Sequence, residues 1–159
     1  MRYVRFLAKG IAPQPLLGAL NDDGNIEVLR GDLFSETKST DQVMGLAEID
    51  AFLPPVDPPN IFALGKNYAD HAAEFDGSVP DEPVIFLKAT TSVTAHRQPI
   101  VLPPGFPDVV DYEAELAVVI DRTAKHVSTA NAADSVLGDT CANDVTPRNS
   151  QKELDGHWA

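Results

Sequence analysis

The sequence predicts an α+β fold in which β-strands dominate. Strand-like runs recur along the chain, only two segments have helical character, and proline-rich stretches forbid helix between them. The strongest strand signal is the alternating stretch 111–120. With 43% hydrophobic and 23% charged residues over 159 positions, the composition is that of one globular domain, or one domain with a small appendage.

The first 55 residues are expected to form a small β-rich unit. Arg2–Leu7 and Asn25–Leu29 are short strand-like runs around a turn at 21–24, where Asp-Gly is a hairpin signal. The stretch 53–59 contains four prolines, which favour an extended connection over helix or central strand. We therefore predict a boundary there, with a small domain at 1–55 and a second domain at 56–159.

Strand and helix signals alternate after this connection. Ile61–Leu64 is predicted to be a short buried strand that ends at Gly65, and Tyr68–Phe75 has helix-forming residues without a breaker. After a polar loop, Val84–Leu87 is predicted to be a second buried strand that continues into Lys88.

The last part of the chain contains the strongest strand and a second helical segment. The proline-rich segment 99–107 precedes the predicted strand Asp111–Ile120. Thr129 can cap a short helix that runs through Val136 and stops at Gly138. A further strand-like segment contains Asn143 and Asp144 and ends at Pro147.

Charge and composition exclude several classes of partner. The formal net charge of −12 repels a phosphate backbone, so we expect no nucleic acid partner. The longest apolar run, Leu116–Ile120, is far too short to cross a bilayer, so no membrane anchor is expected. The N-terminus lacks the apolar core of a signal peptide, and the single cysteine, Cys141, cannot form an internal disulfide. A cytoplasmic protein is the expectation.

Two carboxylates share one face of the predicted strand 111–120. Because side chains alternate along a strand, Glu113 and Glu115 lie on the same face as Ala117 and Val119. The two glutamates are about 6.6 Å apart along the strand, so both carboxylates can reach one hard cation. The alternative is a solvated face with two ordinary glutamates, which the apolar continuation of that face disfavours. Asp144 is available as a third ligand, and three carboxylates suit magnesium or manganese.

Other polar residues are candidates for substrate contact or proton transfer. Arg148 and Gln151 can hold a substrate carboxylate, or can be a surface arginine and a turn glutamine. His71 and Glu74 are neighbours on one helix face, as in a general base with its orienting carboxylate, or as an ordinary solvated pair. Lys88 is either a substrate contact or a strand-end lysine with its amine in solvent.

Four ordered motifs resemble those of the fumarylacetoacetate hydrolase family. The similarity runs from about Asn60 to Trp158, and residues 1–53 are similar to the variable N-terminal domain of bacterial members. The motifs are Gly65–Glu74 (GKNYADHAAE), Pro83–Lys88 (PVIFLK), Asp111–Leu116 (DYEAEL) and Asn143–Gln151 (NDVTPRNSQ).

The resemblance implies a mixed β-roll or β-barrel fold, of which 56–159 would be the N-terminal half of the catalytic domain. It implies magnesium, with manganese or calcium as alternatives, on Glu113, Glu115 and Asp144. It also implies a catalytic dyad, substrate-contacting or substrate-positioning residues, and a homodimer for a full-length member. The dyad is His71 and Glu74, and the substrate residues are Lys88, Arg148, Gln151 and Tyr68.

The sequence departs from the family pattern in three places. Ala89 and Pro147 replace a usual proline and a usual small residue, and neither change removes a ligand. The family continues past a tryptophan like Trp158 into a Lys-Gly segment with a catalytic lysine and a second half of the β-roll. We therefore expect a truncated product or a fragment, in which the apolar face of 111–120 is exposed.

The expected function is metal-dependent hydrolysis of a carbon–carbon bond in a small 2,4-dioxo acid of the acylpyruvate or fumarylpyruvate type. Isomerase and decarboxylase activities on 2-oxo acids of aromatic catabolism use the same family motifs and remain alternatives. A second hypothesis is an inactive remnant that acts only as a binding or assembly module. A third, which depends on charge alone, is an acidic interaction domain without a site.

Overall fold

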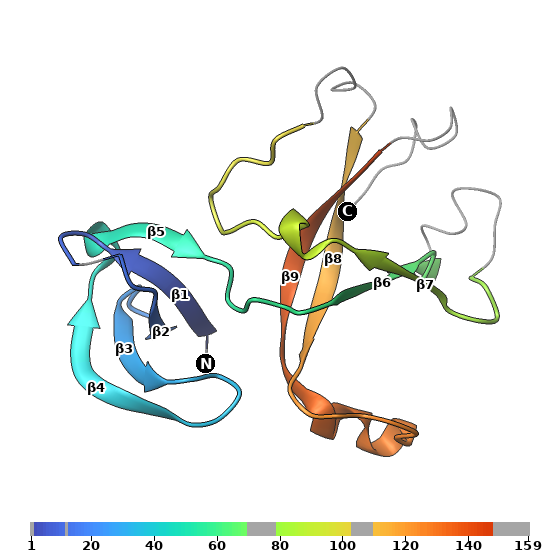
Figure 1. Cartoon of the computed structure of the whole chain (residues 1–159), viewed down its shortest axis with the longest axis horizontal. Coiled ribbons are helices and arrows are strands. Elements are labelled where there is room, and N and C mark those ends of the chain that lie inside the picture. Colours follow the sequence, from blue (N-terminus) through green and yellow to red (C-terminus); the bar gives the residue numbers. More distant parts are fainter. Residues whose placement is uncertain (1, 12, 70–78, 103–109, 148–159) are drawn as a thin grey trace. The chain divides into compact units, whose positions relative to one another are not determined.

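Strands are the main secondary structure of the described chain. The computed structural model describes residues 2–11, 13–69, 79–102 and 110–147. In the last of these ranges, side chains are described only for residues 113–138. Figure 1 shows three separate sheets, none of which closes into a barrel. The predicted mainly β fold is confirmed. None of the described helices is long and apolar enough to span a membrane.

The chain divides into two units by its contacts. One unit comprises Met1–Phe62 with Leu87–Ile100, and the other comprises Ala63–Phe86 with Val101–Ala159. The predicted boundary between 1–55 and 56–159 stays a prediction.

The first unit contains the strands β1 (Arg2–Ala8), β2 (Leu16–Leu20), β3 (Ile26–Gly31), β4 (Thr37–Met44) and β5 (Ile49–Leu53). They form an antiparallel sheet in the order β4-β3-β2-β1-β5. The two predicted strands are present as β1 and β3, but β2, β4 and β5 were not predicted. The predicted turn joins β2 to β3, and Gly24 adopts the left-handed φ of +80° that the Asp-Gly signal requires.

A small apolar core lies on one face of this sheet. Phe6 and Ile26 are fully buried, because alternate residues of β1 and β3 point to the same face. Gly18 on β2 leaves room for them, since a Cβ atom there would overlap the Ile26 side chain. The buried cluster is Phe6, Ala8, Ile26, Val28, Met44 and Ile49.

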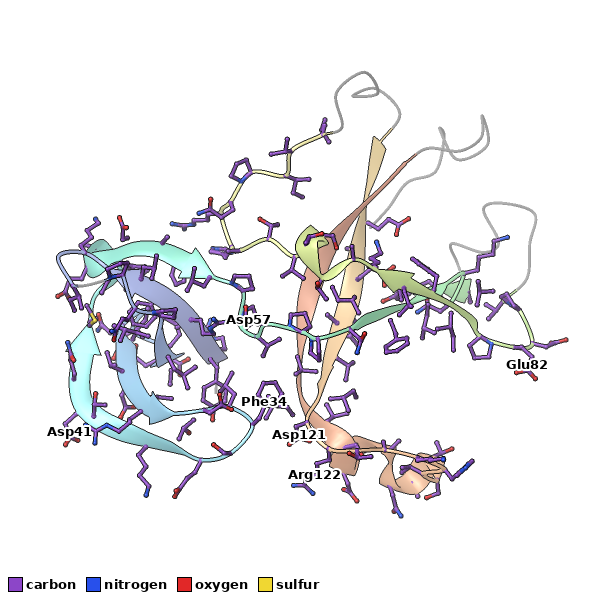
Figure 2. The ribbon with its side chains drawn as sticks, in the orientation of Figure 1. Phe34, Asp41, Asp57, Glu82, Asp121 and Arg122 are labelled. Atoms are coloured by element: carbon purple, nitrogen blue, oxygen red, sulfur yellow. The ribbon has the colours of Figure 1, made fainter. Side chains whose placement is uncertain are left out.

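The proline-rich connection after β5 contains neither helix nor strand, as predicted, and Arg5 of β1 binds to it. The guanidinium donates hydrogen bonds to the Pro54 carbonyl at 3.1 Å and to Asp57 Oδ2 at 2.8 Å. Asp57, labelled in Figure 2, remains largely exposed to solvent. The hydrogen bond from Arg5, with the charge of Arg5, outweighs a slight desolvation and holds the pKa of Asp57 below its ordinary value of 3.8.

This contact has an expected pH dependence. Because the pKa of Asp57 is lower in the folded chain, the ion pair stabilises the fold above the ordinary carboxyl pKa and is lost as pH falls through the folded value. An NMR titration of the Asp57 carboxyl should give a midpoint below 3.8, and Arg5→Met should raise it. Arg2→Met, which removes an exposed arginine from the same strand, is the control and should leave the midpoint unchanged. An Asp57 midpoint unaffected by Arg5→Met would contradict this account.

The next two strands pair with each other. They are β6 (Ile61–Gly65) and β7 (Val84–Lys88), and both lie where the sequence predicts. The prediction that they are buried is wrong, since Phe62 is 70% and Leu87 is 66% exposed. The reason is that a two-stranded sheet has open faces unless another layer packs on it.

The third sheet is a long antiparallel ribbon of β8 (Val110–Ile120) and β9 (Val136–Pro147) (Figure 1). The expected exposure of apolar residues on β8 is confirmed at Leu116 (56%) and Ile120 (56%).

The short helix predicted from Thr129 through Val136 is present over nearly that range, as the 3₁₀ helix η3 (Thr129–Ser135). Ser128 rather than Thr129 is its N-cap, and Gly138 does not end it but lies inside β9. Short side chains that compete for backbone hydrogen bonds, at Asn131, Asp134 and Ser135, disfavour an α-helix here. Two shorter 3₁₀ helices are η1 (Leu46–Glu48) and η2 (Thr90–Ser92).

Candidate functional site

The β8–β9 ribbon brings the three predicted carboxylate positions together. In the antiparallel register Glu113 pairs with Asp144, and Glu115 pairs with Ala142. Directly opposed residues of an antiparallel pair share a face, with Cα atoms about 4.5 to 5.5 Å apart. The backbone therefore places Asp144 opposite Glu113, on the face that Glu115 also shares.

The exposure of β8 alternates as the sequence predicts. Glu113, Glu115, Ala117 and Val119 are half-buried, whereas Ala114 and the alternate residues up to Ile120 are exposed. The two glutamates therefore lie on the less exposed face, beside small apolar residues. Charge on such a face is costly unless it is compensated.

The donor chemistry of this face fits a hard divalent cation. The three positions supply only carboxylate oxygens, which magnesium, manganese and calcium prefer over nitrogen or sulfur ligands. Among the side chains that the structure describes, no three histidine, cysteine or acidic groups come together, and the side chain of Asp144 is not one of those described. The metal assignment of Glu113, Glu115 and Asp144 stays a prediction that the backbone register supports.

Tyr68 makes a hydrogen bond to the strand that carries the glutamates. Its hydroxyl oxygen accepts a hydrogen bond from the backbone N–H of Leu116 at 3.3 Å, between residues 48 positions apart. Leu116 directly follows Glu115. The structure thus connects two of the motifs, the one with Tyr68 and the one with Glu113 and Glu115.

A pocket of ≈ 180 Å³ lies at the end of β6. One wall is the turn Gly65–Asn67, and the other is the loop Val79–Val84, which contains Glu82 (labelled in Figure 2). Sequence reasoning identified 77–83 only as a polar loop and missed this pocket. Lys66 has a left-handed φ of 56°, which no signal in the sequence indicates.

The remaining predicted residues are only partly accounted for. Lys88 is the last residue of β7 and is half-buried, whereas the four residues before it are exposed. Ala69, the second residue of the predicted helix Tyr68–Phe75, has helical backbone, and the rest of that helix, from residue 70 on, lies outside the described residues. The other candidates lie outside the described residues: His71, Glu74, Arg148 and Gln151.

Comparison with known proteins gives matches to both parts of the chain. The family model for the fumarylacetoacetate (FAA) hydrolase C-terminal domain matches residues 60–159, and the model for the Rv2993c-like N-terminal domain matches residues 1–55. An uncharacterized protein of Archaeoglobus fulgidus is 51% identical over 107 residues, which are 67% of this chain and 42% of that protein. The chain therefore spans less than half the length of this relative.

Solved structures resemble the chain over nearly its whole length. A 5-carboxymethyl-2-hydroxymuconate delta-isomerase from Mycobacterium smegmatis superposes with a TM-score of 0.78 and 35% identity, over 99% of this chain and 60% of that one. A fumarylacetoacetate hydrolase from Exiguobacterium antarcticum gives a TM-score of 0.67 and 29% identity, over 99% of this chain and 60% of that one. Both an isomerase and a hydrolase thus share this fold.

Proposed function

The chain belongs to the fumarylacetoacetate hydrolase family, and on that premise we propose that it carries the metal-binding half of an enzyme that hydrolyses small 2,4-dioxo acids. The main support for the proposal is the backbone register of β8 and β9, in which Glu113 pairs with Asp144 on the same face of the ribbon as Glu115. Hydrolysis of an acylpyruvate would cleave the bond between the distal carbonyl carbon and the adjacent methylene carbon. The products would be a carboxylic acid and pyruvate.

Glu113, Glu115 and Asp144 would hold a divalent cation, with magnesium the first candidate and manganese or calcium as alternatives. When bound, the cation supplies positive charge for the substrate carboxylate and for the enolate oxygen that develops as the bond breaks. The half-buried position of the two glutamates supports this role, because a weakly solvated face strengthens electrostatic contacts.

The chain's own residues would supply proton transfer and orientation. An imidazole nitrogen of His71 would take a proton from water, with the Glu74 carboxylate orienting the ring. The hydroxide oxygen would bond to the distal carbonyl carbon, the carbon–carbon bond would break, and its electron pair would form the enolate of pyruvate. A proton returned to the methylene carbon completes pyruvate. Arg148, Gln151 and Lys88 would contact or position the substrate.

Isomerisation of an unsaturated 2-oxo diacid is the second candidate function. The similarity to the M. smegmatis delta-isomerase favours this function, because its TM-score and sequence identity are both higher than those of the E. antarcticum hydrolase. An isomerase needs the same enolate stabilisation but transfers a proton between carbon atoms without adding water. Cytoplasmic location, a homodimeric assembly and the identity of the metal belong to the same proposal.

A substrate assay with two readouts separates these functions. The protein is incubated with acetopyruvate or fumarylpyruvate and Mg²⁺, and pyruvate is measured with lactate dehydrogenase. We expect pyruvate release in step with loss of the dioxo acid, and none after EDTA treatment. Isomerisation of 5-carboxymethyl-2-hydroxymuconate without pyruvate release from dioxo acids would favour the second function. Magnesium binding without turnover of either substrate would contradict both and favour a binding module.

A further inference from the structure

Among the described residues β8 pairs only with β9, and the hydrogen bond between Tyr68 and Leu116 lies at the other edge of β8. In an antiparallel ladder the N–H and C=O of one residue point to the same side, and the side alternates from residue to residue. Because the Leu116 N–H is directed to Tyr68, the amide of Leu116 faces away from β9, and those of Glu115 and Ala117 face toward it. Tyr68 therefore occupies an edge position that would otherwise present an open donor.

The same tyrosine ends the turn that forms one wall of the pocket. Lys66 and Asn67 line the pocket, and Tyr68 follows them directly in the sequence. Consecutive Cα atoms are about 3.8 Å apart, so the hydroxyl contact on β8 restricts where this wall can lie. The contact thus links the pocket wall to the strand of Glu113 and Glu115.

The backbone of this turn is strained and needs support. Lys66 has a φ of 56°, a left-handed conformation that residues with a Cβ atom rarely adopt. Such conformations persist only where the surrounding structure holds them. A Cβ atom at Gly65, directly before, would contact Val84 and Phe86, so these side chains lie close to the start of the turn. The hydrogen bond to Tyr68 anchors the chain directly after it.

We propose that Tyr68 is a positioning residue whose hydroxyl holds the pocket-lining turn against the edge of β8 opposite to β9, next to Glu115. Given the proposed function, the pocket would receive the acyl end of the dioxo acid, and the carboxylate end would meet the cation proposed at Glu113 and Glu115. The lining is suited to a short acyl chain, since Leu64, Val79 and Val84 contribute apolar walls in a space of ≈ 180 Å³.

The test is Tyr68→Phe, which keeps the ring and removes only the hydroxyl. Loss of one hydrogen bond should accelerate hydrogen exchange of the Leu116 amide about 5- to 10-fold, as measured by NMR. Exchange of the Glu115 and Ala117 amides, which face β9, should be unchanged, which confirms that the β8–β9 ribbon of the variant is folded. Tyr3→Phe is the matched control, because Tyr3 is similarly exposed on β1 and its hydroxyl has no hydrogen-bond partner among the described residues.

Kinetic measurements separate positioning from direct substrate contact. The positioning role predicts faster Leu116 exchange, a lower kcat/KM for acylpyruvates with longer acyl chains, and Mn²⁺ affinity unchanged within about 2-fold. Unchanged Leu116 exchange with a raised KM would overturn the proposal and make Tyr68 a substrate contact. If exchange accelerates but even the unmodified protein turns over no dioxo acid, the positioning of the turn is supported and the proposed function fails on its own.

Discussion

Phe6→Ala is expected to unfold most of the N-terminal sheet. Phe6 is fully buried and is the largest side chain in a core cluster of only six buried residues. Truncation of a buried phenylalanine costs about 3 to 5 kcal/mol, because apolar contacts are lost and a cavity remains. A loss of that size is a large fraction of the stability of a domain this small.

Hydrogen exchange of the β1–β5 amides measures this loss without assuming that both units unfold together. Phe34→Ala is the control, since Phe34 lies in the loop between β3 and β4 (Figure 2) and is 51% exposed. That variant should cost about 0.5 kcal/mol or less. Equal losses for the two phenylalanines would show that the described core does not stabilise this sheet.

Glu113→Ala is expected to lower the affinity for Mg²⁺ by about 100-fold or more and to remove dioxo acid turnover. Glu113 faces Asp144 in the register, so its loss would leave the cation with Glu115 and one carboxylate on the opposite strand. Even residues that only support a metal ligand change affinity by about 10- to 100-fold, and a ligand should count for more. Isothermal titration with Mg²⁺ measures the effect.

The matched control for this variant is Glu27→Ala. Glu27 is also a half-buried glutamate on a strand, but it lies on β3 of the N-terminal sheet. Its substitution should leave the Mg²⁺ affinity unchanged. An affinity that is unaffected by Glu113→Ala, or equally reduced by both variants, would remove Glu113 from the metal site.

The alternation of β8 could be predicted from the sequence, but its pairing could not. Side chains of any strand alternate between faces, so Glu113 and Glu115 share a side wherever the strand lies. The register with β9 depends on how the connection between the strands folds, and that connection contains a 3₁₀ helix. The sequence therefore identified Asp144 as a candidate without showing that it lies opposite Glu113.

Strands β2 and β4 were not predicted, because their residues are not those usually found in strands. β2 contains a glycine and helix-favouring leucines, and the edge strand β4 is mostly polar, so neither has the β-branched and aromatic pattern of a strand. Both form because antiparallel neighbours pair with them. The exposure of β6 and β7 was mispredicted for a related reason, since burial depends on the layers that pack against a strand.

Two features near the candidate site could not be predicted from the local sequence. The left-handed Lys66 and the hydrogen bond from Leu116 to Tyr68 depend on contacts between distant segments, and nothing in the motif itself encodes them. The resemblance to the family supplied roles for His71, Glu74, Arg148 and Gln151, which the described structure leaves as predictions. The backbone register of β8 and β9 is compatible with the predicted carboxylate face, and the site itself stays a prediction.

One cation is expected to bind between Glu113, Glu115 and Asp144. An anomalous difference map from crystals of the protein grown with Mn²⁺ tests it directly, because manganese scatters anomalously and replaces magnesium at oxygen sites. We expect one peak per chain, with carboxylate oxygens of all three residues within about 2.3 Å of it. A peak at other residues, or no peak at saturating Mn²⁺, would contradict the claim.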